Sequence, residues 1–301
     1  MVETASKIWM DGKFVAWEKA QIHILTHTLH YGGGVFEGIR FYETPNGPAI
    51  FRLKEHLERL FYSASKLDMK VPYTKKELAD AIIGLIKINN LRDGYIRPLI
   101  YFGYGKMGLD PRGCKVNVAI ALWPWGAYLG DKPVKVKISR FMRIHPATTY
   151  ADAKICGHYV NSILASLEIH EKGYDEALLM DYKGFLAEGP GENVFIVRKG
   201  TLLTPKLGTI LAGITRLSII EIAKDNKIPV EEKNIREKEL LQADEAFYTG
   251  TAAEISPISK INNKKIGKKP VGPITFQLKE IFTKAIHGQL PKYKKWLTFV
   301  D

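Results

Sequence analysis

The feature that most constrains the fold is a turn-rich stretch near the middle of the chain, which contains Pro124, Gly126, Gly130 and Pro133. Proline and glycine interrupt both helices and strands, and such a stretch commonly separates two domains. A chain of 301 residues has the length of roughly two domains. We therefore expect a smaller domain over residues 1–122, a linker over residues 123–133 and a larger domain over residues 134–301.

Strand and helix signals are mixed on both sides of this linker, which predicts an α+β or α/β fold. Turn pairs at Asp11-Gly12 and Asn46-Gly47 predict two β-hairpins. Thr74 and Glu77 have the spacing of a capping box that opens a helix. The other expected helices are residues 53–67, 157–172 and 213–224, and the other expected strands are residues 95–102, 115–122, 134–139, 176–181, 185–188, 193–197, 201–203 and 245–248.

Composition excludes several classes of protein. The longest apolar run, residues 118–123, is far shorter than the roughly 20 residues that cross a membrane. The charged N-terminal region lacks an apolar signal core, so we expect a cytoplasmic protein without a membrane span. The two cysteines, Cys114 and Cys156, form no CxxC pair, which argues against a disulfide framework and a metal site.

The formal net charge of +12 raises the alternative of a nucleic-acid or anionic-surface binder. Such a binder needs clustered basic residues interleaved with aromatic ones, and only residues 292–296 resemble this faintly. The pairs Lys264-Lys265 and Lys268-Lys269 are small clusters, which we interpret as solvated surface. We expect no nucleic-acid partner.

Lys154 is a candidate nucleophile, because the residues on either side of it are small and apolar. An isolated lysine is usually a surface charge. In an apolar setting the ammonium form is disfavoured, and the neutral amine can attack an aldehyde. The segment Glu188-Gly189-Pro190-Gly191-Glu192-Asn193 forms a stiff turn between two carboxylates. It is either an ordinary hairpin loop or a device that holds a carboxylate against a heteroaromatic ring nitrogen.

Two small-residue turns are candidate anion sites. Gly213 and Thr215 stand at the start of an expected helix, where free backbone N–H groups attract anions. The segment 250–253 supplies a second turn at a strand end, and neither matches a nucleotide-binding fingerprint. Tyr95 and Arg97 lie two apart on an expected strand, hence on one face. The arginine there needs an anionic partner, which is either a structural carboxylate or a ligand.

Nine segments belong together, namely residues 30–32, 35–40, 95–99, 107–109, 124–128, Lys154, 188–189 with 191–193, 213–215 and 250–252. They closely resemble one family, the branched-chain aminotransferases of pyridoxal-phosphate (PLP) fold type IV, and they follow its order over nearly the whole chain. Pro190 is a minor departure, because relatives often have alanine there. The resemblance implies a small N-terminal α+β domain, a larger cofactor-binding domain with a β-barrel-like core and surrounding helices, and pyridoxal 5′-phosphate as the cofactor.

By this resemblance, Lys154 holds the cofactor as a Schiff base and later moves the proton between Cα and the cofactor. Glu188 pairs with the pyridinium nitrogen, and Tyr159 binds the ring oxygen. Arg59 binds the phosphate together with Ile214, Thr215 and Thr251, and Glu192 supports Arg59. The implied cofactor-binding residues are Arg59, Lys154, Tyr159, Glu188, Glu192, Gly213, Ile214, Thr215, Gly250 and Thr251.

The same resemblance implies a substrate site that accepts both aliphatic and acidic side chains. Residues implied to bind substrate are Tyr31, Phe36, Gly38, Arg40, Tyr95, Arg97, Met107, Leu109, Trp125, Tyr128, Thr251 and Ala252, with Tyr159 also lining the apolar pocket. Met107 and Leu109 match a loop that reaches into the partner subunit's site, which implies at least a homodimer, with a hexamer as the alternative. The implied reaction transfers the amino group of leucine, isoleucine or valine to 2-oxoglutarate. A D-amino acid aminotransferase and an aminodeoxychorismate lyase of the same fold are the alternatives.

Overall fold

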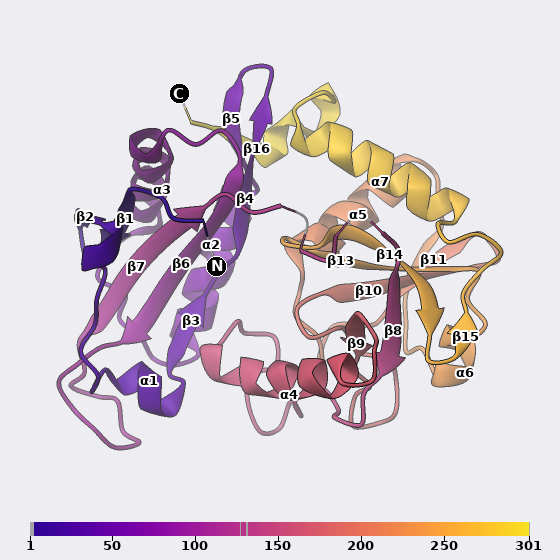
Figure 1. Ribbon diagram of the computed structural model, residues 1–301, viewed down its shortest axis with the longest axis horizontal. Helices are drawn as coiled ribbons and strands as arrows, with labels where there is room; N and C mark the ends of the chain where they lie inside the picture. The colour runs from indigo at the N-terminus through magenta and orange to yellow at the C-terminus, as the bar shows by residue number, and fades with distance from the viewer. Residues whose placement is uncertain (1–2, 127, 131, 301) are drawn as a thin grey trace. The chain divides into compact units, whose positions relative to one another are not determined.

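The computed structural model describes residues 3–126, 128–130 and 132–300 (Figure 1). Ala127 and Asp131, which fall in the expected linker, lie outside the described residues. The chain divides into two compact units. Unit 1 comprises Met1–Gly126, Ala153–His158 and Ala285–Asp301, and unit 2 comprises Ala127–Asp152 and Tyr159–Lys284.

This division differs from the expected one in two segments, because Ala153–His158 and Ala285–Asp301 belong to unit 1 and not to one domain over residues 134–301. The first segment is fixed by an antiparallel bridge between Ile155 and Val35. The second adds an edge strand, with Leu297 opposite Phe51. Both pairings join residues far apart in sequence, and no local turn signal marks them.

Unit 1 is an eight-stranded antiparallel sheet in the order β16-β5-β4-β6-β7-β1-β2, with β3 paired to β6. Its elements are β1 (Lys7–Met10), β2 (Lys13–Ala16), α1 (His27–Tyr31), β3 (Gly34–Phe36), β4 (Ile39–Thr44), β5 (Gly47–Phe51), α2 (Leu53–Ser65), α3 (Lys75–Asn89), β6 (Gly94–Phe102), β7 (Val116–Trp123) and β16 (Leu297–Phe299). The apolar faces of α2 and α3 share one core with the sheet, in which Leu60 and Ile82 meet Ile96 and Ile120. Burial of this continuous apolar surface is the main force that holds unit 1 together.

Unit 2 contains a second eight-stranded sheet, in the order β12-β11-β10-β13-β14-β8-β9, with β15 paired to β14. Its elements are β8 (Val134–Ile138), α4 (Tyr159–His170), β9 (Glu176–Leu178), β10 (Asn193–Arg198), β11 (Thr201–Thr204), α5 (Ile214–Asp225), β12 (Val230–Glu232), α6 (Glu237–Leu240), β13 (Glu245–Gly250), β14 (Glu254–Ile261), β15 (Lys264–Lys265) and α7 (Pro273–Ile286). The strand order is an open path: within the described residues β12 and β9 are its two ends and do not pair with each other. The core of unit 2 is therefore a mixed sheet with two edges.

Local signals predicted many of these elements well. The hairpin β1–β2 forms at its predicted turn, the hairpin β4–β5 turns at Pro45-Asn46, one position before the predicted pair, and the Thr74–Glu77 capping box is complete. The expected hairpin over residues 176–188 forms in part. Backbone bonds join its two arms, with the Ala187 N–H donating to the Leu179 carbonyl and the Leu179 N–H to the Glu188 carbonyl, both at 2.9 Å, whereas the only strand among these described residues is β9, which pairs in parallel with β8. None of the helices in the described part of the chain is long and apolar enough to cross a membrane.

Candidate active site

Lys154 lies in unit 1 on a short segment that is fixed through its backbone. Its N–H donates to Ser63 Oγ at 2.9 Å, and its carbonyl accepts from the Phe36 N–H at 3.2 Å. Its neighbours Ala153 and Ile155 are buried in the core of unit 1. The Lys154 amine is 4.9 Å from the centre of the Phe36 ring. The side chain is therefore half-buried beside an apolar surface, as the sequence predicts.

The same segment approaches the turn after α1 at two glycines. Gly157 N–H donates to the Gly32 carbonyl at 3.1 Å, and a Cβ placed on Gly32 would lie 2.9 Å from the Gly157 Cα. Gly32 also has a φ of +69°, which side-chain-bearing residues rarely adopt. Any larger residue at position 32 would displace the backbone that carries Lys154.

Arg59 is held by a buried acid that sequence reasoning missed. Glu37 has no exposed surface, and its two carboxylate oxygens accept from Arg59 Nε at 2.6 Å and Nη2 at 2.9 Å. His56 Nδ1 lies 2.7 Å from Glu37 Oε2, so the imidazole donates from this nitrogen. Burial alone would raise the pKa of Glu37, but Arg59 and His56 outweigh it and bring the pKa well below its usual range. Glu37 is therefore an anion that orients Arg59.

An aromatic cluster surrounds Arg97. Its guanidinium carbon lies 4.7 Å from the centre of the Phe36 ring, 5.3 Å from Tyr95 and 5.8 Å from Trp123. Nη2 donates to the Tyr95 hydroxyl at 3.2 Å, whereas Nε is buried without a partner. Among the described residues no carboxylate pairs with Arg97. A cation in an aromatic setting with spare donors is suited to bind an anionic ligand.

The predicted residues Gly38 and Trp125 belong to this cluster. A Cβ on Gly38 would lie 1.8 Å from the Tyr95 hydroxyl, so only glycine leaves room for that phenol. The Trp125 ring stands edge-on to Tyr95 at 4.6 Å. Trp123 was not predicted, although its register opposite Tyr95 on β7 brings it there.

Arg40, which was predicted to hold a substrate carboxylate, makes backbone contacts in the structure. Its Nη2 donates to the Trp125 carbonyl at 2.9 Å and to the Gly126 carbonyl. These bonds fix the end of β7 to β4, and Arg40 is buried. Its position therefore supports the segment that carries Trp125.

Tyr31, Met107 and Leu109 form a separate group in unit 1. The Tyr31 hydroxyl accepts from the Gly108 N–H at 3.3 Å, and Met107 and Leu109 flank that glycine. Within the described residues, Tyr31 contacts His27 and His30 of α1 and Gly108 of this loop, and not the aromatic cluster. Leu109 is 87% exposed.

In unit 2, Glu188 lies at the centre of a polar network and is buried. Arg143 Nε donates to its Oε1 at 2.6 Å, Asn193 Nδ2 donates to its Oε2 at 3.0 Å, and the Leu211 N–H donates at 3.1 Å. Sequence reasoning singled out Glu188 but not Arg143, which lies 45 positions earlier. The guanidinium compensates the charge of the buried carboxylate, whose position is thereby fixed.

The predicted anion site at the start of α5 is open to a ligand. Gly213 is the N-cap residue and supplies no side-chain cap, so the first N–H groups keep their capacity to bind an anion. A Cβ on Gly213 would lie 1.8 Å from Asn193 Oδ1, which links this turn to the Glu188 network. Ile214 and Thr215 are buried in the first turn of the helix.

The remaining predicted residues of unit 2 lie on neighbouring turns. A Cβ on Gly250 would lie 3.5 Å from Glu192 Cγ, and the Tyr128 N–H donates to the Ala252 carbonyl at 3.4 Å. Thr251 is half-buried between these two contacts. Tyr159 begins α4, which is joined to the acidic turn where Ser162 Oγ donates to the Pro190 carbonyl at 2.7 Å.

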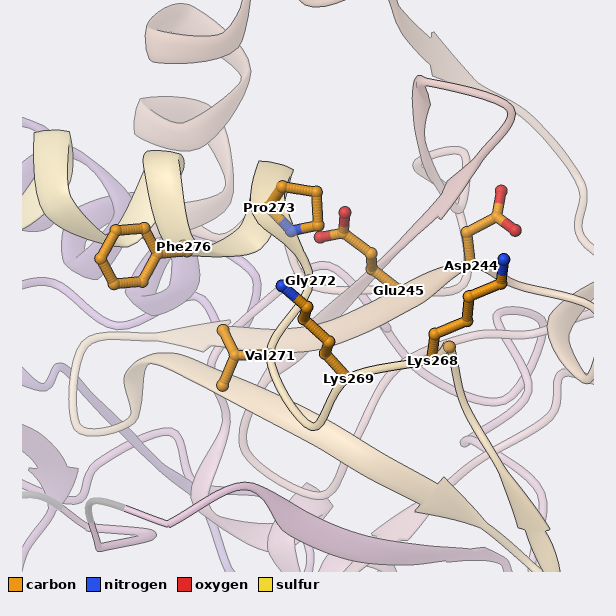
Figure 2. A pocket seen from close by; sticks show the side chains of 9 residues that line it. Asp244, Glu245, Lys268, Lys269, Val271, Gly272, Pro273 and Phe276 are labelled. Atoms are coloured by element: carbon orange, nitrogen blue, oxygen red, sulfur yellow. The ribbon is translucent and has the colours of Figure 1, made fainter.

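None of the predicted site residues lines the cavity of about 630 Å³ at the start of α7 (Figure 2). Glu245 caps that helix, accepting from the Ile274 N–H at 3.1 Å and from the Thr275 N–H at 2.7 Å. Lys268 and Lys269 border the cavity. The Glu245 carboxylate at this cavity is therefore used to cap α7.

The chain is similar to known proteins along its whole length. Residues 34–261 match the family described as amino-transferase class IV. A branched-chain-amino-acid aminotransferase of Pseudomonas aeruginosa is 44% identical over 100% of this chain and 99% of its own, and one of Escherichia coli K12 is 40% identical over 99% and 98%.

Solved structures give the same result. The branched-chain amino acid aminotransferase of Thermobaculum terrenum in its PLP form has a TM-score of 0.95 at 35% identity, covering 99% of this chain and 99% of its own. The branched-chain aminotransferase of Thermoproteus uzoniensis with norvaline has a TM-score of 0.95 at 43% identity, covering 99% of this chain and 100% of its own. The chain belongs to the class IV amino-transferase family.

Proposed function

We propose that this protein is a PLP-dependent branched-chain aminotransferase, which transfers the amino group of L-leucine, L-isoleucine or L-valine to 2-oxoglutarate. The products are the corresponding branched 2-oxo acid and L-glutamate. Relatives named for this activity match the chain over its full length. The D-amino acid aminotransferase and aminodeoxychorismate lyase alternatives have no such support among these relatives.

The side chains present fit this cofactor. Lys154 offers a half-buried amine, Glu188 a buried carboxylate held by Arg143, and the first turn of α5 a set of N–H groups without a side-chain cap. Arg59 offers a guanidinium that Glu37 orients. An amine, an acid for a ring nitrogen and two phosphate-binding elements are the groups that hold PLP.

When bound, PLP supplies an aldehyde that reacts with amines and a pyridine ring that withdraws electrons from the substrate Cα. We assign to Lys154 the covalent bond to the cofactor and the transfer of the Cα proton. Glu188 would keep a proton on the ring nitrogen, and Arg143 and Asn193 keep Glu188 in place. Tyr159 would bind the ring oxygen. Arg59, Ile214, Thr215 and Thr251 would bind the phosphate, with Glu192 in support.

The surroundings of Arg97 support the assignment of substrates most strongly. The enzyme must accept an aliphatic side chain and, in the other half-reaction, the second carboxylate of glutamate or 2-oxoglutarate. Arg97 can bind that carboxylate because it has a buried unpartnered Nε and no acidic partner among the described residues. The rings of Phe36, Tyr95 and Trp125 offer apolar surface to leucine. Aromatic rings beside a cation thus serve both kinds of side chain.

We also propose that the active form is at least a homodimer. Unit 1 exposes a group of large apolar side chains on two segments, namely Ile22, Ile24, Leu25, Leu29, Tyr31, Tyr104, Met107 and Leu109. Rings of His23 and Tyr104, 4.3 Å apart, join the two segments. A patch of this kind marks an interface. Sedimentation equilibrium distinguishes a dimer, at twice the mass of one chain, from a hexamer and from a monomer, and a monomer would contradict the proposal.

A substrate panel tests the proposed reaction. Purified protein with PLP and 2-oxoglutarate should form L-glutamate from L-leucine, L-isoleucine and L-valine, and should not transfer from D-alanine. Transfer from D-alanine without transfer from L-leucine would replace the proposal by the D-amino acid alternative. Both cysteines are free thiols, which supports the cytoplasm as the proposed compartment.

A further inference from the structure

The loop that carries Met107 and Leu109 is shaped by its own residues. Gly105, Gly108 and Gly113 have positive φ values, which permit its sharp turns. Asp110 pairs with the Arg112 side chain at 2.8 Å, and Lys106 Nζ donates to the Arg112 carbonyl at 3.2 Å. These bonds are internal and exposed, so they set the form of the loop without fixing its direction.

One residue at the tip of the loop, Gly108, is bound to helix α1. Its N–H donates to the Tyr31 hydroxyl at 3.3 Å, and its carbonyl lies 2.8 Å from His27 Nε2. A carbonyl can only accept, so His27 carries a proton on Nε2 and donates it. The N–H and the carbonyl of Gly108 thus both bind α1 and fix the tip of the loop. Gly108 lies between Met107 and Leu109, the two residues that the resemblance implies to bind substrate.

His27 is a polar side chain in a buried, largely aromatic position. It is 3% exposed, and its ring packs against Tyr31 at 4.6 Å and Phe102 at 5.8 Å. Its Nδ1 is buried without a hydrogen-bond partner. An apolar ring would fill this space without leaving a polar atom unpaired. The bond to Gly108 is the one polar contact of the ring among the described residues, and it is the reason for a histidine here.

We propose that His27 is a positioning residue that, together with Tyr31, holds the Met107–Leu109 tip in the orientation needed to recognise the substrate side chain. The inference rests on the proposed function, because the family resemblance behind that function also implies that Met107 and Leu109 bind substrate. His27 itself acts only through Gly108. Gly108 has a φ of +107°, which side-chain-bearing residues rarely adopt, and in this conformation its N–H and its carbonyl both bind α1.

Two substitutions separate the hydrogen bond from packing. His27→Phe keeps an aromatic ring against Tyr31 and Phe102 but removes the donor, whereas His27→Gln keeps a side-chain N–H with a reach similar to that of Nε2. His287→Phe is the matched control, because His287 Nδ1 also lies 2.8 Å from a backbone carbonyl, that of Glu43, in the same unit.

Hydrogen exchange of the holoenzyme tests the tether directly. The peptide over residues 105–113 should exchange about five-fold faster in His27→Phe than in the wild type, the effect of losing one hydrogen bond. It should exchange at the wild-type rate in His27→Gln and His287→Phe. Equal exchange in His27→Phe and the wild type would overturn the tether, and equal rates in the Phe and Gln variants would overturn the role of the donor.

Steady-state kinetics test whether the bond between His27 and Gly108 contributes to substrate recognition. The kcat/KM for L-leucine should fall about five-fold in His27→Phe, mainly through KM, while the absorption spectrum of the bound cofactor stays unchanged. The Gln variant should recover the wild-type value. Faster loop exchange with unchanged kinetics would overturn the role in recognition. A wild-type enzyme that does not transaminate leucine would refute the proposed function and leave the exchange result to stand by itself.

Discussion

Arg59 donates two parallel hydrogen bonds to Glu37, a residue with no exposed surface, from Nε at 2.6 Å and from Nη2 at 2.9 Å. This geometry uses the edge of the guanidinium formed by Nε and Nη2. Because both ends of the interaction are charged and shielded from water, it is among the stronger contacts of unit 1. The orientation of Arg59, the residue assigned to the cofactor phosphate, therefore depends on Glu37.

The first prediction concerns cofactor affinity. Glu37→Gln keeps the shape of the side chain but removes its charge, so Arg59 should lose its fixed orientation and apo-protein should bind PLP about ten-fold more weakly. Fluorescence titration of apo-protein with PLP measures this. Glu55→Gln is the control, because Glu55 lies on α2 like Arg59 and pairs with Arg52 at a more exposed site. Equal affinities of the Glu37 variant and the wild type would contradict the assigned role.

The second prediction is the pH dependence of stability. The pKa of Glu37 in the folded protein lies below its ordinary value of 4.5, so the ionised form favours folding. The stabilisation is fully present above about pH 5 and is lost as pH falls toward the lowered pKa. The difference in unfolding free energy between the wild type and Glu37→Gln should stay constant from pH 5.5 to 8 and shrink below about pH 4. Urea unfolding measures it, and a difference that grows on acidification would be inconsistent with this account.

The third prediction concerns the two classes of substrate. Arg97→Ala removes the proposed partner of the second carboxylate, so kcat/KM for glutamate and 2-oxoglutarate should fall by roughly 100-fold, the cost of a charged hydrogen bond. The value for leucine should fall much less, since its side chain contacts the rings. Half-reactions with each amino acid measure the ratio. Equal losses for leucine and glutamate would remove Arg97 from this role.

The fourth prediction is a chemical reactivity. Burial raises the pKa of Cys156 to about 11, although Arg97 and Lys154 favour the thiolate. The thiolate is the reactive form, so iodoacetamide labelling of Cys156 should be slow at pH 8 and should accelerate about ten-fold per pH unit up to pH 10. Cys114→Ser removes the other thiol and allows labelling to be followed by mass spectrometry. A rate that levels off near pH 9 would show an ordinary thiol.

The sequence predicts best what local chemistry decides. The Asp11-Gly12 hairpin and the Thr74–Glu77 capping box depend on residues within a few positions of one another, and both form as expected. The apolar neighbours of Lys154 also predict its half-buried setting. The pairing of Ile155 with Val35 is a long-range contact, so the assignment of this segment to unit 1 was not foreseen.

Partners of the site residues were harder to predict than the residues themselves. Glu37 and Arg143 look like any other charged residue in sequence, and only the fold brings them to Arg59 and Glu188. The aromatic surface beside Arg97 needed the register of β6 against β7, which places Trp123 opposite Tyr95. Glu37 lies between Phe36 and Gly38 in the sequence, and Trp123 lies opposite Tyr95 on the neighbouring strand. Their proximity to these predicted site residues is the signal that could have identified them.

The proposed function depends on a bond between the Lys154 amine and the cofactor, and this bond can be trapped by reduction. Holoenzyme reduced with borohydride and digested should yield one phosphopyridoxyl-modified peptide, with the modification at Lys154. The same treatment of Lys154→Ala should give no modified peptide and no transamination. A modification found on a different lysine, or none on wild-type protein saturated with PLP, would contradict the account.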